Sequence, residues 1–384
     1  MTLRAMALVL AALVAAGCTS NTATSAPGDP RALTVSATDS GCRVSATSAP
    51  AGTLTFSVTN DGGAITEFYV LAADGLRVVA EIENIGPGIR RDLVLSAPAG
   101  SYFTACKPGM IGDGIRSAFT VTDTGQSVGP TGDDAALVAT ATSQYASYVR
   151  DQTDQLLTAT KAFAALYVAG KDDEARAMYP LARVHWERIE TVAESFGDLD
   201  PKMDAREADL ESGEAWTGWH RIEKDLWPQR AAGYTPVTAA ERTTYADDLV
   251  ANTTVLYERT RTITFTADAL GNGAKGLLDE VATGKVTGEE EYWSRTDLYD
   301  FQANVDGARI AWQALQPLLQ RKDAALDTQI AVRFAELQTL LDAHKVGTGY
   351  VSYDTLTPTQ VKALSDAVNA LSEPLSKMTA AVLT

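Results

Sequence analysis

The sequence predicts a multidomain protein in which an N-terminal all-β sandwich is followed by an all-α helical bundle. Three observations predict this order: short alternating apolar runs up to about residue 123, a glycine-rich linker, and long stretches rich in Ala, Leu, Glu, Gln and Arg from Ala135 onward. A chain of 384 residues is also longer than one ordinary hydrophobic core requires. Two folded units are therefore expected.

Short strands predict the β domain at residues 33–123. Leu54, Phe56 and Val58 alternate with polar residues, and residues 60–63 (Asn-Asp-Gly-Gly) then indicate a turn. Further short runs lie at 68–71, 76–80, 92–95, 101–105 and 118–121. About seven short strands within about 90 residues are typical of a sandwich.

The linker at 124–134 contains Gly125, Gly129, Pro130 and Gly132. After it, residues 135–384 have the composition of long helices, with candidate helix ends at Gly170, Gly197, Gly271 and Gly347. Helices of this length need partners to bury their apolar stripes, so about 250 residues imply a bundle or a pair of bundles.

Residues 1–17 predict a lipoprotein signal peptide. Arg4 gives a positive start, and residues 5–16 form an apolar run too short to span a bilayer. The run leads into Ala-Ala-Gly-Cys at 15–18, which resembles a bacterial lipobox; an ordinary secretory signal with an incidental cysteine is the alternative. Residues 18–32 are rich in Ser, Thr, Ala and Pro and predict a flexible tether. We expect lipid attachment at Cys18 and a location on the extracytoplasmic face of the cell membrane.

The net charge of −17 makes nucleic acid an improbable partner, because a phosphate backbone would repel the protein. An acidic surface suits cations. Solubility outside the cell explains the total charge equally well.

Histidine is informative because the chain has only three: His185, His220 and His344. No pair has the His-Glu-x-x-His spacing of the usual zinc metalloproteases, which excludes hydrolysis by that route. His220 and Glu223 are three residues apart and so lie on one helical face, where they could share a metal ion. A hydrogen-bonded core pair is the alternative.

Glu187, Glu190 and Glu194 follow helical spacings of three and four, which predicts that they line one face of a helix. Like charges so placed repel by about 0.2–0.5 kcal/mol per pair, which a bound cation or arginine partners such as Arg183 and Arg188 would relieve. A solvated acidic face is the alternative. Carboxylates with one imidazole suit iron, manganese or zinc better than copper(I).

The β domain holds Cys42 and Cys106, which outside the cytoplasm form either a disulfide or part of a metal site. Residues 106–110 (Cys-Lys-Pro-Gly-Met) resemble the cysteine-to-methionine loop of copper proteins. A blue-copper site needs two imidazoles as well, and this domain has no histidine. Blue-copper electron transfer is therefore not expected.

Several stretches resemble the EfeO family of bacterial iron-uptake proteins. They are VHWERIE at 184–190, ESFGDLD at 194–200, GWHRIE at 218–223 and TDLYDFQANVDG at 296–307, together with TEF at 66–68 and EIENIGPG at 81–88. The likeness runs from about Cys42 to the C-terminus. It implies a cupredoxin-like β domain joined to an imelysin-like helical domain.

The resemblance also implies functional residues and partners. His220 and Glu223 correspond to the His-x-x-Glu metal motif of the imelysin-like domain, with Glu187 and Glu190 as neighbouring ligands. Glu67, Cys42 and Cys106 match positions proposed as ligands in the cupredoxin-like domain. Iron, as Fe²⁺ or Fe³⁺, is the expected ion; zinc could occupy the same site, and copper in the β domain is left open. The family's partners are an iron permease in the membrane and a secreted haem peroxidase of the dye-decolorising type.

One departure from the family pattern stands at Arg295, where a histidine is expected and no imidazole is available. Our hypothesis is an iron-binding protein that hands its ion to the permease and is not an enzyme. The alternatives are a ferroxidase or imelysin-type peptidase, and an adhesion or scaffold protein whose carboxylates are merely surface.

Overall fold

The computed structural model describes residues 28–125, 128–210 and 213–384. The predicted signal peptide, Cys18 and the first part of the tether lie outside the described residues. In the described part of the chain, no helix is long and apolar enough to cross a membrane.

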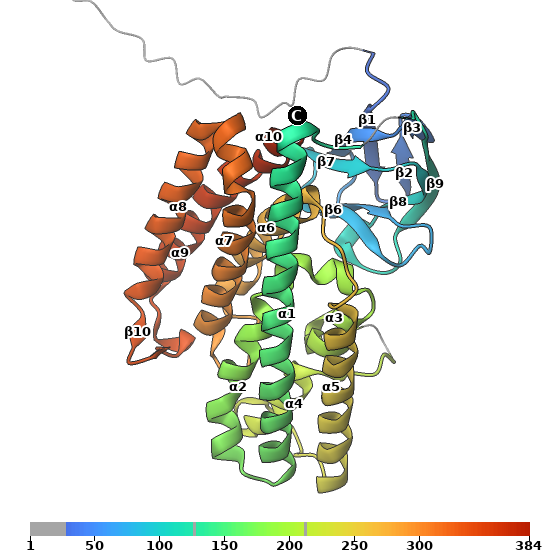
Figure 1. Cartoon of the computed structure of the whole chain (residues 1–384). Helices are drawn as coiled ribbons and strands as arrows, with labels where there is room; N and C mark the ends of the chain where they lie inside the picture. The colour runs from blue at the N-terminus through green and yellow to red at the C-terminus, as the bar shows by residue number, and fades with distance from the viewer. Residues whose placement is uncertain (1–27, 126–127, 211–212) are drawn as a thin grey trace, which may run out of the picture.

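Two packed sheets form the N-terminal domain, which confirms the predicted all-β class (Figure 1). The first sheet has the order β2 (Gly41–Val44), β1 (Ala32–Thr38), β4 (Gly52–Asn60) and β7 (Arg90–Ala97). The second has the order β3 (Ser48–Pro50), β9 (Ile115–Thr122), β8 (Gly100–Cys106), β5 (Thr66–Leu71) and β6 (Val78–Ile85). The pairs β1–β4 and β3–β9 are parallel and the others antiparallel.

The core between these sheets is aromatic. Phe56 from β4 lies 5.3 Å from Phe68 of β5 and 5.5 Å from Phe119 of β9, measured between ring centroids. Leu54, Phe56 and Val58 are all buried, as their alternation predicted. The nine strands in the described residues of the β domain exceed the predicted seven because β2 and β3 are too short to show a period.

The rest of the chain is helical, as predicted (Figure 1). The long helix α1 (Gly132–Val168) runs the length of the domain and packs against α2 (Asp172–Glu187), α5 (Ala239–Arg259) and α7 (Asp297–Lys322). A second group consists of α6 (Ala267–Thr283), α7, α8 (Ala324–Asp342), α9 (Pro358–Leu375) and α10 (Met378–Leu383). The domain is therefore a pair of bundles that share α7.

Short elements connect the two groups. They are η2 (Glu190–Phe196), α3 (Leu199–Asp204), η3 (Glu207–Asp209), α4 (Trp219–Leu226), η4 (Pro228–Arg230), η5 (Lys285–Thr287) and the hairpin β10 (Lys345–Val346) and β11 (Gly349–Tyr350), followed by η6 (Tyr353–Thr355).

Two expectations about the helices are wrong. Gly271 does not end a helix but lies inside α6, where a Cβ would come within 2.3 Å of Thr379 Oγ1, so the glycine allows α10 to approach. Glu187, Glu190 and Glu194 do not share one helical face, because α2 ends at Glu187 and the chain turns into η2. The side chains of Glu187 and Glu190 both contact Lys285, whereas Glu194 lines the interdomain cleft.

The β domain packs on α6 through β6 and β7 (Figure 1). Arg91 forms an ion pair with Asp279 at 2.9 Å, and the backbone N–H of Ser96 donates to Asp268. Asn272 donates to the carbonyl oxygen of Val94. These contacts are polar, and they leave an open cleft beside them.

Candidate metal centre

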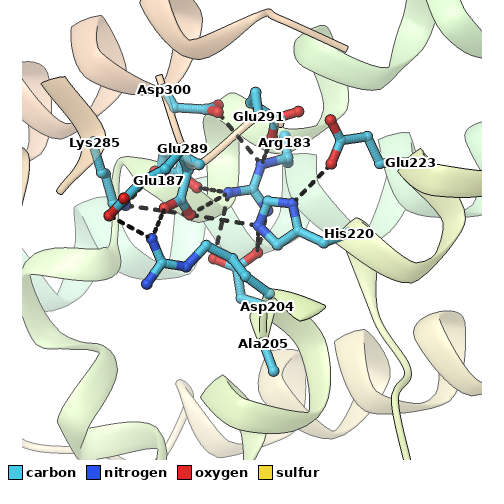
Figure 2. A network of polar contacts seen from close by, with 12 residues as sticks. Arg183, Glu187, Asp204, Ala205, His220, Glu223, Lys285, Glu289, Glu291 and Asp300 are labelled. Carbon is cyan, nitrogen blue, oxygen red and sulfur yellow. Dashed lines mark hydrogen bonds and ion pairs between the residues drawn. The ribbon is translucent and has the colours of Figure 1, made fainter. Parts of the chain in front are cut away.

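A buried cluster of charged side chains lies where α2, α3, α4 and the segment from Lys285 to Asp300 meet (Figure 2). His220 projects into it from the first turn of α4. The approach of α4 to α3 depends on Gly218, whose φ is +87°, because a Cβ there would lie 2.2 Å from the carbonyl oxygen of Met203. The glycine thus lets His220 reach Asp204 at the end of α3.

The two nitrogens of the fully buried His220 ring have different surroundings. Nδ1 lies 3.1 Å from Oε2 of Glu223. Among the described residues, Nε2 has no partner at good hydrogen-bond geometry, and it lies 3.4 Å from both Oδ1 of Asp204 and Oε1 of Glu290. A buried imidazole nitrogen that faces two carboxylates is the clearest place in the cluster for a proton or a metal cation.

Glu223 is held in place from both sides. Its Oε1 accepts the backbone N–H groups of Trp293 at 2.8 Å and Ser294 at 2.6 Å, while Oε2 faces His220. A carboxylate bound to Nδ1–H orients an imidazole and leaves the Nε2 lone pair for a metal. The geometry therefore suits Glu223 to an orienting role.

Arg183 occupies the middle of the cluster and is completely buried. Its guanidinium contacts five carboxylates: Glu187 at 2.5 Å, Glu291 at 2.7 Å, Glu290 at 3.2 Å, Asp300 at 3.6 Å, and Asp204. Carboxylates gathered at this density would otherwise repel one another. Arg183 thus fixes the positions of the acids around His220.

Lys285 is the second internal cation. Its Nζ lies 2.6 Å from Glu190, 3.1 Å from Glu187 and 3.8 Å from Glu290. Asn304 donates to the same two carboxylates, Glu187 and Glu190, at 2.9 and 2.7 Å. Glu187 and Glu190, both predicted as ligands, therefore already contact Lys285 and Asn304, and Glu187 also contacts Arg183.

The protonation states follow from these contacts. Burial alone would raise the pKa of Asp204, but Arg183 and His220 hold it below its usual value. Burial would also raise the pKa of Glu290, but Lys285 and His220 hold that pKa well below its usual range. Burial and Arg183 disfavour a charged imidazole, yet the neighbouring carboxylates of Glu223, Glu290 and Asp204 raise the pKa of His220 well above 6.5. Without an ion, a proton therefore occupies Nε2.

Two groups of side chains have ligand atoms within 4.8 Å of one another among the described residues: Asp204–His220–Glu290, and His220–Glu223–Glu291. The second group uses Glu223, whose oxygens are already engaged, and Glu291, which accepts from Ser294 and contacts Arg183. The first group uses Nε2, which has no hydrogen bond of good geometry within the described residues, although Arg183 also contacts Oδ1 of Asp204 and Oε1 of Glu290. It is the better candidate for a cation.

The structure brings His220 and Glu223 together as the sequence predicted, but places Glu187 and Glu190 with Lys285, in neither group. His185 lies elsewhere, with Nδ1 3.0 Å from Gln152; burial and Arg188 lower its pKa to about 4. The guanidinium of Arg295 donates a hydrogen bond to the carbonyl oxygen of Gly288, and its Nε lies 3.4 Å from Oδ1 of Asp354.

Sequence reasoning missed Asp204 and Glu290. The acidic run at 289–291 was a possible signal for one of them, and the i, i+4 spacing of Asp200 and Asp204 for the other. Neither signal stands out in a chain with 49 acidic residues.

In the β domain, Cys42 and Cys106 form a disulfide, with Cα atoms 5.3 Å apart. The sequence left open a disulfide or a metal site, and the structure has the disulfide. The nearby Glu67 is buried; its carboxylate accepts from the hydroxyl of Tyr69 and lies 3.8 Å from Lys107. Since a bonded sulfur is no thiolate ligand, these three residues do not form a metal site in this state.

Comparisons with known proteins identify the family of the chain. Residues 141–378 match the family model of imelysin. The chain is 42% identical over 256 residues to an "Efem/EfeO family lipoprotein" of Staphylococcus haemolyticus, covering 66% of this chain and 87% of that protein. It is 36% identical over 353 residues to "Iron uptake system component EfeO" of Yersinia pestis, 91% of each chain. Identity to the protein of that name from Escherichia coli O157:H7 is 34% over 382 residues, 97% of this chain and 96% of that one.

Proposed function

This chain belongs to the EfeO family, with a helical domain of the imelysin family, and on that premise we propose that it captures iron outside the cytoplasm for delivery to a membrane permease. Two of its relatives are named as components of an iron uptake system, and the matches cover 91% and 96% of their lengths.

One observation carries the proposal: the buried Nε2 of His220 has no hydrogen-bond partner and lies 3.4 Å from one oxygen each of Asp204 and Glu290. Metal–ligand bonds of about 2.1 Å at angles of about 90–109° place neighbouring ligand atoms about 3.0–3.4 Å apart. The two nitrogen–oxygen distances of 3.4 Å lie at that spacing, and an ion bound there would share the two oxygens with Arg183.

The donor set is one imidazole nitrogen and two carboxylate oxygens, with Glu223 orienting the ring. Such hard-to-borderline donors suit iron, and they also accept zinc or manganese, since geometry and supply decide among these ions. Iron is the ion proposed here because the relatives are named for its uptake.

The proposed location follows from the N-terminus, where lipid at Cys18 would hold the protein at the outer face of the cell membrane. The partners are an iron permease and a secreted haem peroxidase of the dye-decolorising type. The Cys18→Ala variant should no longer be found in the membrane fraction. Its retention there would contradict lipid attachment at Cys18.

The site is tested by iron content and calorimetric titration of the full chain, wild type against His220→Ala. Iron binding should be lost in this variant and be weakened at least about tenfold in Asp204→Asn and Glu290→Gln. His185→Ala is the matched control, because that ring is also partly buried and hydrogen-bonded but lies outside the cluster. Equal affinity in wild type and His220→Ala would refute the assignment.

We propose binding without turnover. Iron-loaded protein should neither cleave an unstructured protein substrate nor accelerate oxygen consumption by ferrous iron. Either activity, if lost in His220→Ala, would favour the peptidase or the ferroxidase alternative.

A further inference from the structure

The two carboxylates that face Nε2 of His220 each direct one oxygen at it. Oδ1 of Asp204 and Oε1 of Glu290 both lie 3.4 Å from Nε2. The second oxygen of each acid has another neighbour. Oδ2 of Asp204 accepts a hydrogen bond from the indole Nε1 of Trp186 at 2.7 Å, and Oε2 of Glu290 lies 3.8 Å from Arg206. These neighbours therefore influence how many oxygens each acid can give to an ion.

Packing in the core fixes the indole of Trp186. The residue lies on α2 three positions after Arg183, on the same helical face, and is completely buried. Its ring packs against Phe196 of η2, with the ring centroids 6.1 Å apart. The indole therefore cannot turn away from Asp204 unless the core rearranges.

Trp186 and Arg183 both contact Asp204, but they differ in charge. The guanidinium of Arg183 contacts Oδ1 and lies 3.4 Å from Oδ2, and its positive charge opposes a cation bound to either oxygen. The indole N–H is neutral and can only donate a hydrogen bond. It therefore engages one oxygen of the carboxylate without repelling an ion on the other.

Metal ions differ in the number of oxygens that they require. Calcium takes about six to eight oxygen ligands and often binds a carboxylate through both of its oxygens. Iron and zinc are suited to imidazole and need fewer ligands. A centre in which Asp204 gives a single oxygen beside the imidazole of His220 therefore suits iron or zinc better than calcium.

We propose that Trp186 is a positioning residue that limits Asp204 to one metal-binding oxygen, and that it thereby makes the His220 centre prefer iron to calcium. The inference rests on the proposed function. Calcium is a relevant competitor because extracellular modules bind it with Kd values of about 10⁻⁴–10⁻³ M. Loss of a hydrogen bond to a ligand commonly weakens a metal site by about 10–100-fold. Trp186 thus affects the choice of ion without touching the ion.

The test is calorimetric titration of the full chain with ferrous ion, under anaerobic conditions, and with calcium. The test variant is Trp186→Phe, which keeps a buried aromatic ring but removes the indole N–H. The matched control is Trp312→Phe. The indole of Trp312 is also buried and also donates to a carboxylate, that of Asp327 at 3.0 Å, but it lies between α7 and α8. Thermal unfolding compares the stability of the two variants.

Trp186→Phe should bind ferrous ion about 10–100-fold more weakly than wild type. Its calcium affinity should rise, because Asp204 can then present both oxygens, while the control keeps both wild-type affinities. An unchanged iron affinity, or a calcium affinity that does not rise, would overturn the role of Trp186 and leave the proposed function intact. Absence of iron binding by the wild type would overturn the proposed function, and this inference with it.

A measurement on the wild type keeps the inference testable if Trp186→Phe does not fold. Nuclear magnetic resonance of isotope-labelled tryptophan follows the indole N–H of Trp186. Its signal should shift when zinc, a diamagnetic substitute for ferrous ion, is added, because its acceptor Asp204 becomes a ligand. Calcium at the same concentration should not shift it. A signal that zinc leaves unmoved, or that calcium moves equally, would overturn the inference.

Discussion

The candidate metal centre and the cleft are both acidic, but their carboxylates have opposite surroundings. In the centre, Arg183 and Lys285 contact the acids, and hydrogen bonds fix their directions. In the cleft, burial and mutual repulsion raise the pKa values, to about 8 for Glu83 and about 7 for Glu194. Fixed counter-charges create a rigid site of set geometry, whereas acids without them respond to pH and to free cations.

The largest effect is expected from removing the counter-charge of the centre. Arg183→Met would leave five buried carboxylates without their shared guanidinium, so the free energy of unfolding should fall by about 3–5 kcal/mol. Urea unfolding at pH 7 measures it. Arg188→Met, whose ion pair with Asp306 is long and partly exposed, should cost less than about 1 kcal/mol. Similar losses in both variants would contradict a special role for Arg183.

The orienting role of Glu223 is tested by Glu223→Gln. An amide N–H facing Nδ1 favours the tautomer with a proton on Nε2, so iron affinity should fall about 10–100-fold while the fold persists. Calorimetric titration measures this loss. Glu291→Gln should change affinity less, since Glu291 belongs only to the second group. A larger loss in Glu291→Gln would favour that group over Asp204–His220–Glu290.

The pH dependence of binding follows from His220. The carboxylates of Glu223, Glu290 and Asp204 raise the pKa of its ring above 6.5 against the opposing effects of burial and Arg183, so a proton competes with the ion for Nε2 at neutral pH. Affinity should therefore fall as pH drops, by about tenfold per unit, with the decline beginning above pH 6.5. Titrations between pH 5.5 and pH 8.5 check this. An affinity constant across that range would contradict it.

A smaller effect of opposite sign is expected from the cleft. Desolvation raises the pKa of Glu83 to about 8, so the folded state binds a proton that the unfolded state releases near pH 4.5. The stability contributed by this proton is complete below about pH 4.5 and is lost as pH rises through about 8. Thermal unfolding with a chelator present should show that decline. Glu83→Gln should flatten it and exceed wild type in stability at pH 8.5; parallel curves would contradict the assignment.

Local patterns in the sequence predicted the domain order and the pairing of His220 with Glu223 in the candidate centre. Alternation at Leu54, Phe56 and Val58 predicted a strand because strand side chains have a period of two. The spacing of His220 and Glu223 placed both on one helical face, and Nδ1 of His220 lies 3.1 Å from Oε2 of Glu223 in the structure. The resemblance carried by residues 184–190 and 218–223 identified the family.

Tertiary structure alone decided which carboxylates face the free nitrogen of His220. Asp204 and Glu290 come from a short helix and from a loop without a period, and they reach the ring only because Gly218 lets α4 approach α3. Glu187 and Glu190 have helical spacing, yet α2 ends between them and Lys285 binds both. Sequence spacing predicts neighbours within one helix, but the contacts of a buried charge depend on segments about 100 residues apart, which no local pattern records.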